Sequence, residues 1–306
     1  MNAGVEPWLL KNSLIIKALV LASVFLFWFS HYVYLPTLPQ YVLLNTGTLT
    51  KVGIVLAMYG LWQAVIRLPI GIITDNIGHR KSFILVGIVL AGAGALVLGL
   101  GETFAELTLG RSLVGLSMGA WVLQVVFFGS LFRDDEVIKA GSILTLASSL
   151  AKMAGTFANG YLNSLGGYLT AFLVSASAAA VSLLVLLVVP ENSAYLESQQ
   201  PPFQIRNVLR SRKVLLVSLL AAVNQFLNFG IVFGFFPLIA ETLGASDVFK
   251  SYLLTVNLLC LIGGNLLVTS IGNRKNSVVL LAISYLFFGT GIVLTPIAGG
   301  VSLLFL

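Results

Sequence analysis

Three basic side chains lie inside long apolar runs, and they are the first candidates for chemistry. Arg67, Arg111 and Lys152 are each flanked by mostly apolar residues over a length that could cross a membrane. A charged side chain is costly in hydrocarbon, so it normally faces water or a partner. All of the 11 acidic residues fall outside these runs or near their ends. Three central cations without central acids therefore predict a cavity that favours anionic or phosphate-like solutes.

Neutral polar residues extend this expected solute path. Tyr59, Gln63 and Arg67 recur every four residues and so share one face of a helix. His31 has two readings, a proton carrier or a hydrogen-bonded packing residue, and both stay open. The expected path comprises His31, Tyr34, Tyr59, Gln63, Arg67, Lys152, Thr156, Asn224, Gln225 and Asn228.

The run that contains Lys152 is polar along one side from end to end. Its polar residues recur at steps of three and four, which places them on one helix face. Such a face could form a hydrogen-bonded seam with another helix, or it could border water in a central cavity. Lys152, near the middle of the run, favours the cavity. The residues of this face are Ser142, Thr145, Ser149, Lys152, Thr156, Asn159 and Asn163.

Motifs for catalysis or metal binding do not occur in the sequence. There is no H-E-x-x-H, nucleotide-binding glycine loop, G-x-S-x-G elbow or pair of acids within an apolar run. The two histidines, His31 and His79, are expected on opposite sides of a membrane, which argues against a shared metal site. The single cysteine, Cys260, is expected to be buried and provides no disulfide framework. We therefore predict no enzyme, no cofactor and no metal.

The composition is that of a polytopic all-α membrane protein. Hydrophobic residues make up 58% of the chain and charged residues 9%, whereas soluble domains average about 25% charged residues. The mean hydropathy is +1.00. A membrane span needs about 20 apolar residues. This length predicts nine spans, at Leu14–Leu35, Val52–Ile73, Phe83–Leu100, Phe104–Phe128, Val137–Leu162, Tyr168–Val189, Val214–Phe236, Val248–Ile271 and Val278–Ile297.

The distribution of the basic residues predicts the orientation. In the nine-span arrangement Lys51 and Lys250 fall on one side of the membrane, and most other cations fall on the opposite side. Cytoplasmic loops are enriched in Lys and Arg, so the N-terminus is expected in the cytoplasm of a multi-pass cell-membrane protein. The net charge of +6 then reflects topology, and no nucleic-acid partner is expected. The cations of the cytoplasmic side are Lys11, Lys17, Arg80, Lys81, Arg133, Lys139, Arg206, Arg210, Arg212, Lys213, Arg274 and Lys275.

An internal repeat predicts two bundles. The loop I-G-H-R-K-S at 77–82 is echoed by I-G-N-R-K-N at 271–276, and each loop lies between two predicted spans. The longest polar connection separates the copies, which predicts an N-terminal six-helix bundle at 1–190, a cytoplasmic loop at 191–213 and an incomplete C-terminal bundle at 214–306. A further apolar run begins at Gly299 and stops at Leu306, so we expect a C-terminally truncated form of a twelve-span parent.

The loop between the second and third spans carries a spacing that suggests a family. Its pattern, G-x-x-x-D-x-x-G-x-R-K over 71–81, resembles the signature loop of major facilitator superfamily transporters. That resemblance implies a cytoplasmic gating role for Gly71, Asp75, Gly78, Arg80 and Lys81. His79 departs from the pattern, because the family usually has Arg there. In the repeated loop, the equivalent residues are Gly272, Arg274 and Lys275.

Two further spans resemble this family. Arg111, Gly115 and Gly119 match the R-x-x-x-G-x-x-x-G pattern of its fourth helix, although close helix packing would also explain the glycines. Gly155 and Gly160 match two of the six positions of the antiporter signature in its fifth helix. The remaining four positions differ, so helix packing stays an alternative and export is only weakly indicated.

The resemblance implies a secondary active transporter. We expect two bundles that rock about a midplane site and carry a small solute across the lipid bilayer, with efflux of a drug or metabolite ahead of uptake. A proton or a sodium ion is the candidate coupling ion, and the protein is expected to be monomeric. Two alternatives stay open, a metabolite uptake symporter and a truncated membrane protein that does not transport.

Overall fold

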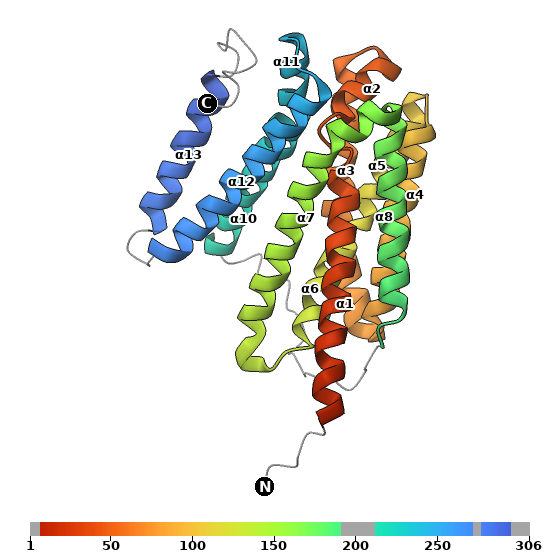
Figure 1. Cartoon of the computed structure of the whole chain (residues 1–306). Coiled ribbons are helices and arrows are strands. Elements are labelled where there is room, and N and C mark those ends of the chain that lie inside the picture. The colour runs from red at the N-terminus through yellow and green to blue at the C-terminus, as the bar shows by residue number, and fades with distance from the viewer. Residues whose placement is uncertain (1–6, 191–211, 272–276, 295–306) are drawn as a thin grey trace.

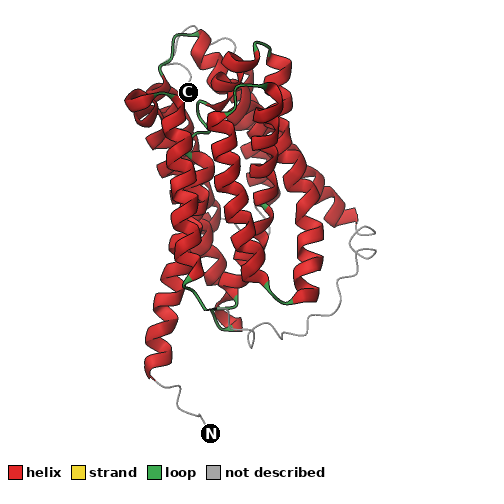
Figure 2. Cartoon of the chain, turned by 90° about the vertical axis from the view of Figure 1, so that its right-hand side faces the viewer, coloured by secondary structure: helices red, strands yellow, loops and turns green. Residues whose placement is uncertain are grey.

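The computed structural model describes residues 7–190, 212–271 and 277–294, and every regular element in these ranges is helical (Figure 2). The all-α fold class is therefore confirmed for this part of the chain. The elements are α1 Pro7–Tyr32, α2 Leu38–Thr46, α3 Leu49–Ile77, α4 Arg80–Leu100, α5 Phe104–Ser117, α6 Gly119–Gly129, η1 Asp134–Glu136, α7 Val137–Gly166, α8 Tyr168–Leu187, α10 Arg212–Leu227, η3 Asn228–Phe235, α11 Phe236–Thr242, α12 Asp247–Ile271 and α13 Ser277–Leu294.

Eight helical segments within the described residues are long and apolar enough to cross a membrane. They coincide with the first eight predicted spans. The ninth predicted span corresponds to α13, which has 18 residues and lies beside α12 at the edge of the molecule (Figure 1). Exposed Leu, Val and Ile side chains occur along the outer faces of these helices, as a hydrocarbon environment requires.

The first six spans form one bundle, in which small residues bring the helices close together. A Cβ added at Gly94 of α4 would lie 2.8 Å from the carbonyl oxygen of Gly110 in α5. A Cβ added at Gly110 would lie 3.0 Å from the carbonyl oxygen of Gly94. Because lipid provides little hydrophobic drive for helix association, van der Waals contact between close backbones is a main source of stability.

Three breaks in the helices differ from the predicted continuous spans. The fourth span is interrupted at Met118, between α5 and α6. The seventh begins as α10, continues as the π-helix η3 and ends as α11. A short helix, α2, also follows the first span. Like α11, it has a proline at its first or second position, and α2 and α11 contact each other. A proline fits this position because the first turn of a helix needs no amide donor.

The second group of helices, α10 to α13, lies against α7 and α3 of the first bundle. The ribbons of α7 and α12 lie close together near α2 and α11 and diverge toward the opposite end (Figure 1). Cys260 of α12 is exposed, so the prediction that it is buried is wrong. Its neighbours Leu259 and Leu261 are exposed as well.

Candidate solute cavity and the contact that closes it

A polar cavity of about 330 Å³ lies between the two groups of helices. Side chains of α1, α3, α6, α7, η3 and α12 contribute to its wall, together with the end of α10. Six of the ten residues expected on the solute path line it: Tyr59, Gln63, Arg67, Lys152, Gln225 and Asn228.

Lys152 is the charged group in the α7 wall of the cavity. Its Nζ lies 3.9 Å from the ring centroid of Trp28 and 5.6 Å from that of Tyr32. A cation over an aromatic face is stabilised by the ring quadrupole, and more strongly where water is excluded. No carboxylate among the described residues forms an ion pair with Lys152. The ammonium group is therefore held by neutral rings and stays electrostatically available to an anion.

Arg67 and Gln63 face the same cavity from α3. The Nε of Arg67 is buried and has no hydrogen-bond partner among the described residues. The side chain of Gln63 is also buried. A buried guanidinium nitrogen without a partner is costly, and a solute with an acceptor oxygen would satisfy it. The cavity thus has two positive groups and several neutral amides, and none of the described residues in its wall is acidic.

Four predicted path residues do not line this cavity. His31 is buried within the first bundle, where its Nδ1 lies 2.8 Å from the carbonyl oxygen of Phe27 and its Nε2 lies 2.8 Å from Ser117 Oγ. Tyr34 packs on Phe172, with ring centroids 4.9 Å apart. The two hydrogen-bond contacts of the His31 ring favour its interpretation as a packing residue. The other two are Thr156, which contacts α12, and Asn224, which is exposed on α10.

The polar face of α7 has two parts with different surroundings. Thr145, Ser149 and Lys152 border the cavity. One turn further on, Thr156 Oγ1 lies 3.0 Å from Thr255 Oγ1 of α12, and both side chains are buried. Both interpretations of this face therefore hold, the cavity for its first half and the hydrogen-bonded seam for its second.

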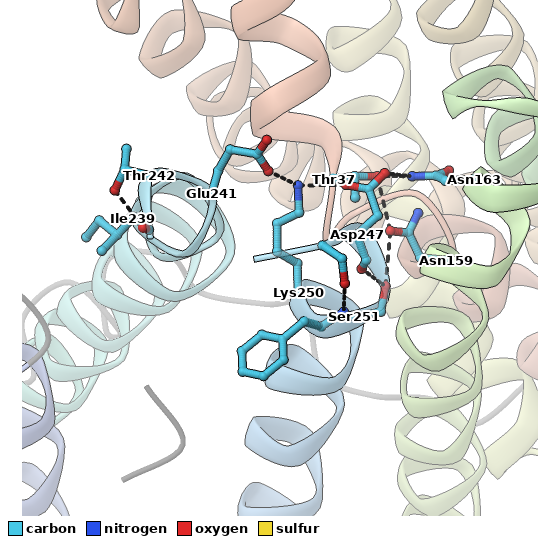
Figure 3. A network of polar contacts seen from close by, with 11 residues as sticks. Thr37, Asn159, Asn163, Ile239, Glu241, Thr242, Asp247, Lys250 and Ser251 are labelled. Carbon is cyan, nitrogen blue, oxygen red and sulfur yellow. Dashed lines mark hydrogen bonds and ion pairs between the residues drawn. The ribbon is translucent and has the colours of Figure 1, made fainter. Parts of the chain in front are cut away.

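Asn159 and Asn163 form the centre of that seam, which we call the α7–α12 network (Figure 3). Asn159 Nδ2 donates to the carbonyl oxygen of Val33 at 2.8 Å. Its Oδ1 accepts from Thr37 at 3.1 Å and from Ser251 of α12 at 3.3 Å. Asn163 Nδ2 lies 3.0 Å from both Thr37 Oγ1 and Asp247 Oδ2. Two asparagines of α7 thus join the turn after α1 to the first turns of α12.

A buried lysine extends this network into α11. Lys250 Nζ lies 2.7 Å from Asp247 Oδ1 and also pairs with Glu241 Oε2. The lysine side chain is fully buried, whereas the two carboxylates are 27% and 37% exposed. Asp247 bonds both Lys250 and Asn163, so the ion cluster and the asparagines act as one connected unit (Figure 3). The charge distribution of the sequence predicted Lys250 only as a topological charge on the outer side and gave no pairing for it, although the i,i+3 spacing of Asp247 and Lys250 is present in the sequence.

The two glycines of the fifth-helix pattern mark close backbone contacts on α7. A Cβ added at Gly155 would lie 3.0 Å from the amide nitrogen of Val33 at the end of α1. A Cβ added at Gly160 would lie 2.3 Å from the Cα of Val248 in α12. Gly155 therefore brings α7 close to its own bundle, and Gly160 permits contact with the other group of helices.

In the fourth-helix pattern the two glycines pack closely against α3, and the arginine is buried. Gly115 lies against α3, where an added Cβ would be 2.9 Å from the carbonyl oxygen of Tyr59. A Cβ added at Gly119 would lie 3.2 Å from Ile66, which is also in α3. Arg111 is buried, and its guanidinium carbon lies 4.4 Å from the ring centroid of Tyr59. Arg111 thus lies behind the cavity wall and supports Tyr59, which lines it.

The signature loop lies at the end of the molecule away from the α7–α12 network. Gly78 ends α3 with φ of +79°, a left-handed conformation that favours glycine. The Nζ of Lys81 donates to the carbonyl oxygens of Leu187 and Val189 at the end of α8. Cations stabilise helix C-termini in this way. The structure describes the backbone of Asp75 but not its side chain, and Gly272, Arg274 and Lys275 lie outside the described residues.

Comparison with known proteins identifies a family. The family model described as Major Facilitator Superfamily matches residues 20–306. The inner membrane transport protein YajR of Escherichia coli (strain K12) is 27% identical over 171 residues, which cover 54% of this chain and 37% of YajR. An uncharacterized transporter of Buchnera aphidicola subsp. Schizaphis graminum (strain Sg) is 27% identical over 153 residues, 50% of this chain and 39% of that protein.

Solved transporters share the fold. The nucleoside transporter NupG aligns with a TM-score of 0.65 at 13% identity, over 85% of this chain and 66% of NupG. A bacterial homolog to the human lysosomal transporter Spinster aligns with a TM-score of 0.64 at 15% identity, over 89% of this chain and 63% of that one. These likenesses, together with the eight apolar helices, confirm a multi-pass membrane protein. The aligned part covers about two fifths of the length of the curated relatives.

Proposed function

Because this chain belongs to the Major Facilitator Superfamily, we propose that it serves as a secondary active transporter of a small anionic solute, by alternating access between its two groups of helices. The observation that supports this proposal most directly is the polar cavity between these groups, with Lys152 and Arg67 in its wall. Alternating access needs a central site that two bundles can expose in turn. No described cofactor-binding or metal-binding group is needed for this activity, and we keep the expectation of a non-enzymatic monomer.

The proposed orientation follows from the charges. Enrichment of Lys and Arg in cytoplasmic loops places the signature loop in the cytoplasm and the α7–α12 network at the outer face. The conformation described above is then closed outside and diverges toward the cytoplasm. We propose 1–190 and 214–306 as the two units that move, with 191–213 as their connection.

Efflux is the direction we propose, with uptake symport as the alternative. The proposal of efflux rests on the resemblance of P-T-L-P-Q-Y at 36–41 and G-L-W-Q-A-V-I-R-L-P-I-G at 60–71 to the drug- and metabolite-exporting branch of the family, and a proton or a sodium ion could drive it. Proteoliposomes preloaded with an organic anion and placed in an imposed pH or sodium gradient would separate the directions. Loss of preloaded solute supports efflux, whereas accumulation from outside supports a symporter. Neither loss nor accumulation across a solute panel would contradict transport itself.

Replacing Lys152 by Gln tests the anionic preference. The substitution keeps a polar, unbranched side chain, one atom shorter, and removes the charge that lies over Trp28. We expect transport of organic anions to fall about 10-fold, the effect of about 1.4 kcal/mol of lost charge attraction. Transport of a cationic solute is expected not to fall. Lys139→Gln is the matched control, because Lys139 lies on α7 with a side chain 67% exposed. Tighter binding of cationic drugs than of anions, unchanged in Lys152→Gln, would contradict the anionic preference.

Replacing Asp75 by Asn tests the proposed gating role of the signature loop. The substitution keeps the size of the side chain and removes its charge, so folding and insertion should be unaffected. We expect transport to fall at least about 10-fold if the charge helps to close the cytoplasmic end. Expression level and gel-filtration profile report insertion, and flux in proteoliposomes reports gating. A normal flux in Asp75→Asn would remove this residue from the gate.

A further inference from the structure

Trp28 of α1 carries a buried hydrogen-bond donor without a partner. Its side chain is 5% exposed, and the residue lines the polar cavity. The indole Nε1 has no hydrogen-bond partner among the described residues. His31, the neighbouring polar side chain on α1, is not its acceptor, because the two ring nitrogens of His31 contact Phe27 and Ser117. A buried N–H without an acceptor is costly, so it indicates a partner that the protein itself does not provide.

The surroundings of Trp28 belong to the first bundle, whose six spans are all described. The centroid of its ring lies 5.1 Å from that of Trp121 in α6 and 6.0 Å from that of Tyr32 in α1. The ammonium group of Lys152, from α7, lies over the same ring. Three helices of one bundle thus hold the indole in place, and the cavity that it lines is the route by which an acceptor can reach the N–H.

Two donors of different kinds meet at this ring. Lys152 Nζ lies 3.9 Å from the ring centroid and forms no ion pair with a described carboxylate. Nε1 belongs to the ring itself, so the two donors are close neighbours. A hydrogen bond spans about 2.9 Å. Two oxygens on one carbon, phosphorus or sulfur atom can therefore reach both donors at once.

We infer that Trp28 is a specificity-determining residue for the solute: its indole N–H donates a hydrogen bond to one oxygen of the bound anion, while Lys152 pairs with another oxygen of the same group. This inference rests on the proposed transport function and narrows its solute class to carboxylates, phosphates and sulfonates. A hydrogen bond to a charged acceptor is stronger than one to a neutral acceptor. The N–H thus adds discrimination between an anion and a neutral molecule of the same shape.

Removing the N–H while keeping the ring tests this donor. Nonsense suppression can replace Trp28 by 3-benzothienylalanine, an isosteric analogue in which sulfur stands in place of the N–H. The ring can then still lie under Lys152 and pack on Trp121. In proteoliposomes we expect the KM of benzoate and phenyl phosphate to rise about 10-fold, with little change in maximal rate. The same analogue at Trp62 is the matched control, because Trp62 does not line the cavity, and it should leave KM unchanged.

Indole N–H resonances report the contact without relying on flux. The chain has four tryptophans, so selective labelling with ¹⁵N gives at most four indole signals, and Trp28→Phe identifies that of Trp28. We expect this signal to move downfield and saturate when benzoate or phenyl phosphate is added to the protein in nanodiscs. Benzamide, which has the same ring and no charge, should leave it in place. In Lys152→Gln the anion titration should need about 10-fold more anion, since the ammonium group binds the same head.

The outcomes separate this inference from the transport function. If the anions are transported with the same KM in the Trp28 analogue as in the unmodified protein, the inference is overturned and the transport function stands. A Trp28 signal that stays in place at saturating anion also overturns it, because water then satisfies the N–H. An unmodified protein that transports no member of a solute panel contradicts the transport function and this inference together. Gel filtration of each variant confirms that a change in KM does not come from unfolding.

Discussion

Replacing Gly160 by Ala is expected to prevent the close contact of α7 with α12. The new Cβ would lie 2.3 Å from Val248 Cα and 2.7 Å from the carbonyl oxygen of Asp247. These are backbone atoms at the start of a helix, so they cannot turn aside as a side chain could. Overpacking costs about 1–3 kcal/mol, which corresponds to a shift of roughly 5- to 150-fold in the population of this conformation.

Distances between spin labels across the contact would measure this shift. Leu165 lies 79% exposed near the end of α7, and Thr242 is exposed at the end of α11. Labelled cysteines at these two positions, in a Cys260→Ser background, should show longer distances in Gly160→Ala. Gly141→Ala is the control, because its Cβ has open space on the same helix. An unchanged distance distribution in Gly160→Ala would show that this contact does not limit the conformation.

Replacing Lys250 by Met is expected to destabilise the same end of the molecule. The methionine would fill a similar volume, but Asp247 and Glu241 would lose the ammonium group that both contact. Removing one partner of a buried ion pair costs about 3–5 kcal/mol. Because the carboxylates are partly exposed, solvent reduces the penalty, and we expect about 2–4 kcal/mol.

Thermal unfolding in nanodiscs measures the loss of stability in Lys250→Met. A lysine from an exposed ion pair provides the comparison. Lys139→Met removes a lysine that lies 3.6 Å from Glu136 and is 67% exposed, so a loss of at most about 1 kcal/mol is expected. Lys250→Met combined with Glu241→Gln should recover part of the loss, since it removes an uncompensated carboxylate. If Lys250→Met were no less stable than Lys139→Met, the buried cluster would contribute little to this contact.

Both variants act on one contact through different physics. Gly160 concerns the space between two backbones, whereas Lys250 concerns the compensation of charge in a buried site. Asn163 links them, because its amide reaches Asp247 and its helix carries Gly160. If the network holds the outer end closed, as the proposed orientation implies, each variant should favour the outward-open state and also change flux.

The apolar spans and the polar face of α7 could be predicted from the sequence. Both depend on local patterns, since hydropathy over about 20 residues sets the length of a span and a 3.6-residue period sets the faces of a helix. The placement of Tyr59, Gln63, Arg67 and Lys152 around one cavity agrees with that reading. The signature loop was also recognisable, because its spacing is confined to one short stretch, from the last turns of α3 to the start of α4.

The breaks within the spans were harder to predict. The interruption at Met118 and the π-helix at Asn228–Phe235 lie inside continuous apolar runs, where hydropathy does not change. Their geometry depends on the helices packed around them. Local periodicity contains no information on those neighbours.

The sequence by itself determined the environment of this protein, its helical spans and the helix face that carries its central polar groups. Only the tertiary structure decided that this face divides at Thr156 between a cavity and a seam, and that His31 packs against Ser117. The reason is distance along the chain. Asn159 contacts residues 92 to 126 positions away, and a helical period states which side a residue faces but not which helix lies there.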